Sequence, residues 1–202
     1  GRKPAFLDDI VGLVIGPLFV LAELGFGLGL RREVQQAVEQ LHLGDGLQAG
    51  VTTGPLIDEK AIAKVQEHIA DAVGKGARVI TGGKVDALGG NFFQPTILVD
   101  VPDGAKVAKE ETFGPLAPLF RFTDEADVIR QANDTEFGLA AYFYARDLSR
   151  VFRVGEALEY GIVGINTGLI SNEVAPFGGV KASGLGREGS KYGIEDYLEI
   201  KY

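Results

Sequence analysis

Residues 57–166 alternate between helical and extended patterns, and this alternation constrains the fold more than any other feature. Residues 57–73 carry apolar side chains at every fourth position, which predicts a helix with Asp58 as its N-cap. The short apolar run 77–81 follows as a buried strand. Further strands are expected at 116–123, 139–146 and 161–166, and further helices at 32–41, 124–133 and 147–158, the last with Asp147 as its cap. This order predicts an α/β fold, and we expect a three-layer αβα arrangement with a mostly parallel sheet.

The N-terminal stretch 10–30 is a separate apolar run in which Glu23 is the only charged residue. It is long enough to span a bilayer as a helix, which takes ~20 residues. Its glycines and Pro17 weaken it as a helix, and the rest of the chain has the pattern of a soluble protein. We therefore expect residues 1–31 to pack on the core, with 10–30 forming two strands or a helix broken near Gly16. A membrane anchor at 10–30 is the minority alternative.

Charge and composition exclude several classes of function. The net charge is −8, which repels nucleic-acid phosphates, so no nucleic acid is expected as a partner. The chain has no cysteine, so it can form no disulfide, thiolate metal site or cysteine nucleophile. Its two histidines, His42 and His68, are too few for a histidine-rich metal site, and no metal is expected. Because the chain begins at Gly1 and also lacks Met and Trp, we expect a processed, trimmed or engineered product.

The glycine motif at 184–189, GLGREG, has the spacing of a dinucleotide-binding loop. That fingerprint needs a strand before it and an acidic residue ~20 positions after it. Here FGGVKAS precedes the motif, and the sequence ends before the acidic position is reached. We therefore interpret it as a structural glycine loop. No P-loop motif is present either.

The segment 109–115, KEETFGP, places two acids beside an aromatic ring and a Gly-Pro turn, just before an expected strand. Loops at such positions often bind ligands in α/β folds. A carboxylate here could hold a ribose diol while the ring flanks a flat heterocycle. The simpler alternative is that Glu110 and Glu111 lie on a solvated face.

Several segments occur in a fixed order along the chain: GPLID (54–58), GGNFFQPTILVDV (89–101), KEETFGP, NDTEFGLAAYFYARDLSR (133–150), GIVGINTG (161–168) and PFGGVKASGLGRE (176–188). Together they resemble the aldehyde dehydrogenase family. SNEVAPFGG and GREGSKYGIEDYLEIKY further resemble its bacterial succinate-semialdehyde dehydrogenase branch. The resemblance covers about residues 32–202 and implies the catalytic-domain fold of that family. Residues 1–31 match nothing in it, and their native or designed origin stays open.

The resemblance implies roles for a few residues. Glu111 corresponds to the glutamate that holds the nicotinamide ribose of NADP or NAD, and Phe113 to the aromatic residue beside the nicotinamide. Ser171 corresponds to the serine that binds the distal carboxylate of the substrate. Phe177 corresponds to the aromatic residue that lines the substrate tunnel, and Asn166 to a structural position.

The catalytic machinery that the resemblance implies is incomplete in this chain. The family attacks the aldehyde carbon with a cysteine thiolate, and a glutamate activates the water that hydrolyses the thioester. This chain has no cysteine, no segment matching that glutamate and no counterpart of the dinucleotide-binding domain. We therefore expect no catalytic residue, no bound cofactor and no dehydrogenase activity from the chain alone.

Three interpretations of the function remain open. The chain is a truncated or engineered catalytic-domain fragment that is inactive alone, or an oligomerising scaffold or binding module. The third interpretation is one part of an active aldehyde dehydrogenase whose missing parts lie on another chain. The alternating segment 196–202, DYLEIKY, predicts a strand with a free edge, which favours a homo-oligomer. A cytoplasmic location is expected.

Overall fold

The computed structural model describes residues 12–15, 18–21, 27–122 and 124–202, with side chains described at position 32 and from position 34 onward. The chain divides into two compact units. Unit 1 comprises Gly1–Gly16 and Phe122–Tyr202, and unit 2 comprises Pro17–Arg121.

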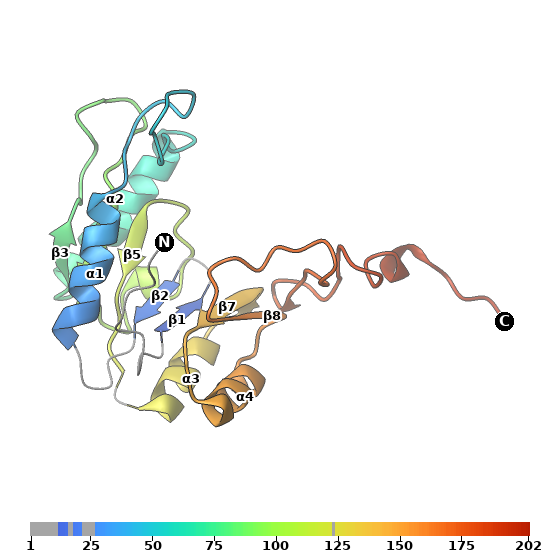
Figure 1. Cartoon of the computed structure of the whole chain (residues 1–202). Coiled ribbons are helices and arrows are strands. Elements are labelled where there is room, and N and C mark those ends of the chain that lie inside the picture. The colour runs from blue at the N-terminus through green and yellow to red at the C-terminus, as the bar shows by residue number, and fades with distance from the viewer. Residues whose placement is uncertain (1–11, 16–17, 22–26, 123) are drawn as a thin grey trace. The chain divides into compact units, whose positions relative to one another are not determined.

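The described residues of unit 2 form two helices, α1 and α2 (Figure 1), and a three-stranded sheet in the order β3-β4-β5. Its elements are β2 (Leu18–Leu21), α1 (Gly27–Glu39), α2 (Glu59–Gly74), β3 (Arg78–Thr81), β4 (Thr96–Val99), the 3-10 turn η1 (Lys106–Ala108) and β5 (Leu116–Pro118). Strand β4 runs antiparallel to β3 and parallel to β5. Gly82, just after β3, has a φ of +70°, and a Cβ there would lie 2.3 Å from the carbonyl oxygen of Pro95, so this turn requires glycine.

The core of unit 2 lies between its sheet and its helices. Ile97, Val99 and Leu119 are buried at its centre, and Val34 and Val38 of α1 pack against them. Helix α2 buries a second stripe, apolar except for His68, whose members share the helical spacing of one face: Val65, His68, Ile69 and Ala72. Asp58 caps this helix as expected, since its side chain accepts a hydrogen bond of 2.8 Å from the backbone N–H of Ala61.

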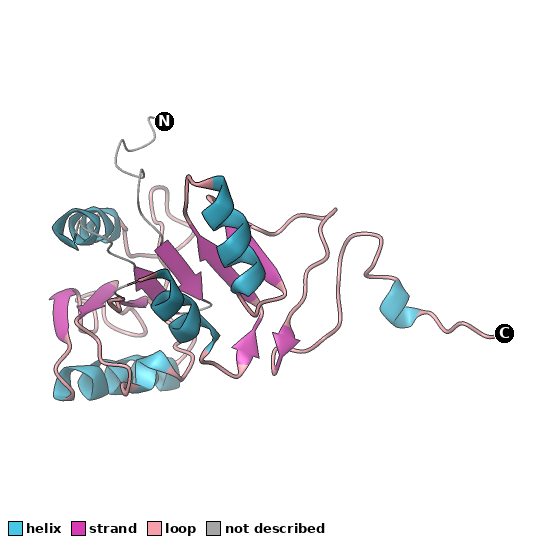
Figure 2. Cartoon of the chain, turned by 90° about the horizontal axis from the view of Figure 1, so that it is seen from below, coloured by secondary structure: helices cyan, strands magenta, loops and turns pink. Residues whose placement is uncertain are grey.

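Unit 1 is built around a strand–helix–strand unit with parallel strands. Its elements are β1 (Gly12–Ile15), α3 (Glu125–Asn133), β6 (Phe137–Gly138), β7 (Ala140–Phe143), α4 (Leu148–Ala157), β8 (Ile162–Ile165), β9 (Val180–Lys181) and the 3-10 turn η2 (Glu195–Tyr197). Helix α4 connects β7 to the parallel strand β8, and β1 pairs antiparallel on the other side of β7. The short strands β6 and β9 lie side by side (Figure 2).

The strand directions are more mixed than expected. Two described pairs, β4–β5 and β7–β8, are parallel, whereas β1–β7, β3–β4 and β6–β9 are antiparallel. A parallel pair needs a long crossover, which α4 provides between β7 and β8. Between β3 and β4 the chain instead returns through a glycine-rich loop, so these two strands run in opposite directions. The α/β class is confirmed, and the three-layer arrangement stays a prediction.

The two terminal segments compare differently with their expectations, since 10–30 contains the two strands that were one of its alternatives, whereas 196–202 does not form the expected strand. Within 10–30 the structure has two short strands, β1 and β2, followed by the start of α1, and the break at 16–17 lies outside the described residues. No helix in the described part of the chain is long and apolar enough to cross a bilayer. The strand expected at 196–202 is absent: a 3-10 turn occupies Glu195–Tyr197, and 198–202 forms no helix or strand. A strand forms its hydrogen bonds with a neighbouring strand, and this segment pairs with none of the described strands.

Candidate functional site

The loop 109–115 in unit 2 presents the two residues expected at the cofactor. It leads from η1 to β5, and Thr112 is its one buried residue. Glu111 is exposed, Thr112 is buried and Phe113 is 78% exposed. The carboxylate of Glu111 and the ring of Phe113 are therefore open to solvent, while Thr112 holds the loop from inside.

Helix α2 holds this loop through a buried histidine. His68 has no exposed surface, and its Nδ1 lies 2.5 Å from the hydroxyl of Thr112. The Nε2 of His68 lies 3.3 Å from the carboxylate of Glu110. Lys64, one turn earlier on α2, forms an ion pair with the same carboxylate. The residues directly before and after Glu111 are therefore both attached to α2.

The charges around His68 determine which of its nitrogens carries the proton. Burial lowers the pKa of His68 below its ordinary value, so the imidazole is neutral at pH 7. Hydrogen bonds from Lys64 and then from His68 hold the pKa of Glu110 below its usual range, so this carboxylate is ionised. An ionised carboxylate only accepts hydrogen bonds, so the proton lies on Nε2, and Nδ1 accepts from the Thr112 hydroxyl.

Two further contacts tie the segment 104–114 to α2. A Cβ on Gly114 would lie 2.5 Å from a methyl carbon of Val65, so the loop backbone touches the helix directly. The backbone N–H of Lys106 donates to the carboxylate of Asp71 over 2.7 Å. The segment 104–114 therefore contacts α2 at both Val65 and Asp71.

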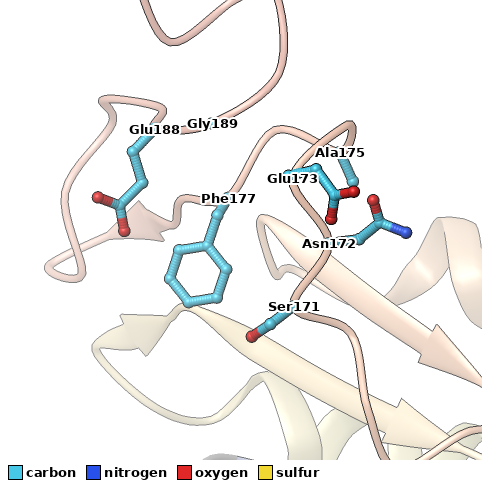
Figure 3. Close-up of a pocket in the computed structure, with 7 residues that line it drawn as sticks. All are labelled: Ser171, Asn172, Glu173, Ala175, Phe177, Glu188 and Gly189. Atoms are coloured by element: carbon cyan, nitrogen blue, oxygen red, sulfur yellow. The ribbon is translucent and has the colours of Figure 1, made fainter.

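A pocket of about 520 Å³ in unit 1 contains the two residues expected at the substrate (Figure 3). Figure 3 shows the hydroxyl of Ser171 and the ring of Phe177 pointing toward one another. Residues 171–177 form one side of the pocket and residues 188–189 form the other, and the remaining lining residues are Asn172, Glu173, Ala175, Glu188 and Gly189.

Backbone hydrogen bonds hold the two sides of this pocket together. Phe177 and Glu188 exchange N–H···O bonds of 2.8 Å in both directions. The N–H of Ser190 also donates to the carbonyl of Glu173 over 2.9 Å. Two carboxylates line the pocket and no lysine or arginine is among its lining residues. Among these lining residues, the hydroxyl of Ser171 and the side-chain amide of Asn172 could donate hydrogen bonds to an anionic ligand.

The structure places the expected residues in two pairs. Glu111 and Phe113 share the loop of unit 2, and Ser171 and Phe177 share the pocket of unit 1. Asn166 has the expected structural role, because its side chain donates to and accepts from the backbone of Ala145 over 2.8 and 2.9 Å.

Sequence reasoning missed the supporting pair His68 and Thr112. The available signal was a lone polar residue on the apolar face of the helix predicted at 57–73. No cluster of three or more potential metal ligands occurs among the described residues.

Comparison with known proteins identifies the family. The model of the aldehyde dehydrogenase family matches residues 29–202. Over 170 residues the chain is 85% identical to the GabD succinate-semialdehyde dehydrogenase of Escherichia coli K12, whose name specifies NADP(+), and 78% identical to a glutarate-semialdehyde dehydrogenase of Pseudomonas aeruginosa. Each alignment covers 84% of this chain but 35% of the relative, so the chain spans about a third of their length.

A solved structure agrees with this relationship. The crystal structure of an E. coli NADP-dependent enzyme superposes with a TM-score of 0.88 at 79% identity, covering 90% of this chain and 38% of the other. The family match begins at residue 29, close to the boundary expected near residue 32. The chain belongs to the aldehyde dehydrogenase family.

Proposed function

We propose that this chain is a catalytic-domain fragment of a succinate-semialdehyde dehydrogenase-like enzyme and that it is inactive alone. The absence of cysteine from a chain whose family match covers residues 29–202 carries the proposal. Oxidation in this family requires a covalent bond between a thiolate and the aldehyde carbon, and no residue here supplies that thiolate. The same proposal includes a three-layer αβα arrangement, the packing of residues 1–31 on the core and a cytoplasmic location.

The loop 109–115 fits one end of NADP or NAD. The exposed carboxylate of Glu111 would accept hydrogen bonds from the nicotinamide ribose, and the exposed ring of Phe113 would flank the nicotinamide. When bound, the cofactor supplies the acceptor for the hydride. The adenine and pyrophosphate would need contacts that this loop does not offer. We therefore expect millimolar or weaker affinity, no more than about 4 kcal/mol of binding free energy.

The pocket fits part of a semialdehyde site. Ser171 would donate a hydrogen bond to the distal carboxylate of the substrate, and Phe177 would cover its carbon chain. Glu173 and Glu188 line the same pocket, so the carboxylate of the substrate is repelled unless another part of an enzyme contributes a cation. We therefore expect the chain to bind the substrate weakly by itself.

The test is the absorbance of reduced nicotinamide. Purified chain is mixed with succinate semialdehyde and saturating NADP⁺, and we expect no turnover above the buffer blank. The E. coli relative, assayed in parallel, shows that the reagents are competent. Turnover that survives repurification of the chain would contradict the proposal. If activity appears only after a second polypeptide is added, the third interpretation, an enzyme split between two chains, is supported.

Self-association is a second candidate function. The C-terminal segment exposes large apolar side chains: Tyr197 at 84%, Ile200 at 98% and Tyr202 fully. Exposed apolar segments with unpaired backbone groups tend to bind another chain. We propose that residues 196–202 become a strand when they pair with a second copy. Deleting them should lower the particle mass measured by light scattering, whereas a monomer before deletion would refute the idea.

A further inference from the structure

His68 is the buried titratable side chain of the described part of the chain, where the other buried polar residues are Thr96 and Thr112. Burying an imidazole is unfavourable unless both of its nitrogens find partners. Both partners of His68 come from the loop 109–115. They are Glu110 and Thr112, the immediate neighbours of Glu111.

We propose that His68 is a positioning residue that fixes the direction in which Glu111 and Phe113 leave the loop. The role in cofactor binding rests on the function proposed for those two residues, whereas the ordering of the loop does not. Glu111 lies between two residues anchored to a single imidazole ring. Because the anchors are adjacent in sequence to the presented carboxylate, rotation of the backbone at Glu111 would break one of them.

The proposal requires a defined pattern of protons. Nε2–H donates to the carboxylate of Glu110, and the hydroxyl of Thr112 donates to Nδ1. The charged groups around the ring are Lys64 and Glu67 from α2 itself and Glu110 from the loop. Lys64 pairs with Glu110, and Lys106 pairs with Glu67, so each acid facing the ring also has a cationic partner.

Four variants separate the two contacts. His68→Leu removes both, and Thr112→Val removes the hydroxyl from the loop side with little change in shape. His68→Asn keeps a polar atom near the position of Nδ1, and His68→Gln keeps one near the position of Nε2. His42→Asn is the matched control, because His42 is the other histidine of the sequence and is exposed. Thr112→Val also tests the proposal if His68→Leu fails to fold.

The first measurement is nuclear magnetic resonance on the full 202-residue chain. We expect the imidazole of His68 to be protonated on Nε2 alone, and His42→Asn assigns its signals by elimination. The order parameters of the Glu111 and Phe113 amides should fall from about 0.85 toward about 0.6 in His68→Leu and Thr112→Val. The Asn and Gln variants should fall between these limits. Protonation on Nδ1, or unchanged order parameters in both variants, would overturn the proposal.

The second measurement is a titration with NADP⁺, followed at the same two amides. If the unmodified chain responds, we expect His68→Leu to weaken binding several-fold and His42→Asn to leave it unchanged. Equal affinity of the unmodified chain and His68→Leu would refute a positioning role in binding. If the unmodified chain does not respond at NADP⁺ concentrations well above the millimolar range, the cofactor-binding role proposed for Glu111 and Phe113 fails, and the order parameters still decide whether His68 orders the loop.

Discussion

The contact between Gly114 and Val65 allows a quantitative test of how the loop is held. Val65 is fully buried on α2, and a Cβ on Gly114 would lie 2.5 Å from its Cγ2. Real Cβ atoms do not approach a methyl group this closely, so Gly114→Ala must move the loop or the helix. Overpacking of this kind costs about 1–3 kcal/mol of the free energy of unfolding.

The complementary variant removes the obstacle. Val65→Ala deletes two buried methyl groups, which costs roughly 2 kcal/mol when the transfer free energy and the cavity are counted together. In the double variant the methyl group that Gly114→Ala introduces occupies space that the valine side chain has vacated. We therefore expect the double variant to be more stable than the sum of the single effects predicts, by about 1–2 kcal/mol.

Urea denaturation followed by circular dichroism measures all four members of this cycle. Gly54→Ala is the control, because a Cβ at Gly54 would have no atom within 4 Å, and we expect a change within about 0.5 kcal/mol. If Gly114→Ala is tolerated as well as the control, the loop backbone does not touch the helix. Strict additivity in the double variant would show that the two residues do not share a contact.

Three further predictions concern charge and capping. Burial lowers the pKa of His68 in the folded chain, so the imidazole of the unfolded chain is protonated first as the pH falls below about 6.5. The free energy of unfolding therefore falls by at most about 1.4 kcal/mol per pH unit until the pKa of the folded chain is reached. Urea titrations of His68→Leu should lack this slope. Glu125 links α3 to α4, and a hydrogen bond from Arg153 is the chief cause that lowers its pKa. Glu125→Gln should lower the free energy of unfolding by about 1 kcal/mol in urea denaturation at pH 7. The exposed control Glu156→Gln should change it very little. Removing the N-cap of α2 by Asp58→Ala should cost about 1 kcal/mol in the same assay, and a variant as stable as the unmodified chain would show that the cap contributes little.

Sequence reasoning predicted well those structural features that depend on residues close together in the sequence. Asp58 and Asp147 cap their helices as expected, because a cap depends on a side chain and a backbone N–H three residues later. Strand direction was predicted less well, because it depends on how distant segments pair. The strand expected at 196–202 shows the same limit, since the alternating pattern indicates which face a strand would bury but supplies no partner.

In the candidate site, too, sequence reasoning identified candidates within one segment but not the residues that contact it from elsewhere in the chain. The segment 109–115 identified Glu111 and Phe113 through its own residues and their resemblance to a family. It did not reveal His68, which is distant in sequence and interrupts the apolar spacing of α2 with a polar side chain. A lone histidine on an apolar helix face indicates that some polar partner is buried with it, but not which one. The partner, Thr112, becomes identifiable only when the helix and the loop are seen together.

The two pairs of candidate site residues, Glu111 with Phe113 and Ser171 with Phe177, are each held by contacts within one unit. Helix α2 supports Glu111 and Phe113 within unit 2, and the paired backbones of Phe177 and Glu188 support the pocket within unit 1. Because neither support uses a residue of the other unit, a change in one should leave the local geometry of the other intact. If the chain is inactive alone, as we propose, it can still retain preformed parts of a binding site, since positioning is local whereas the reaction requires a nucleophile, a cofactor and a substrate at one point.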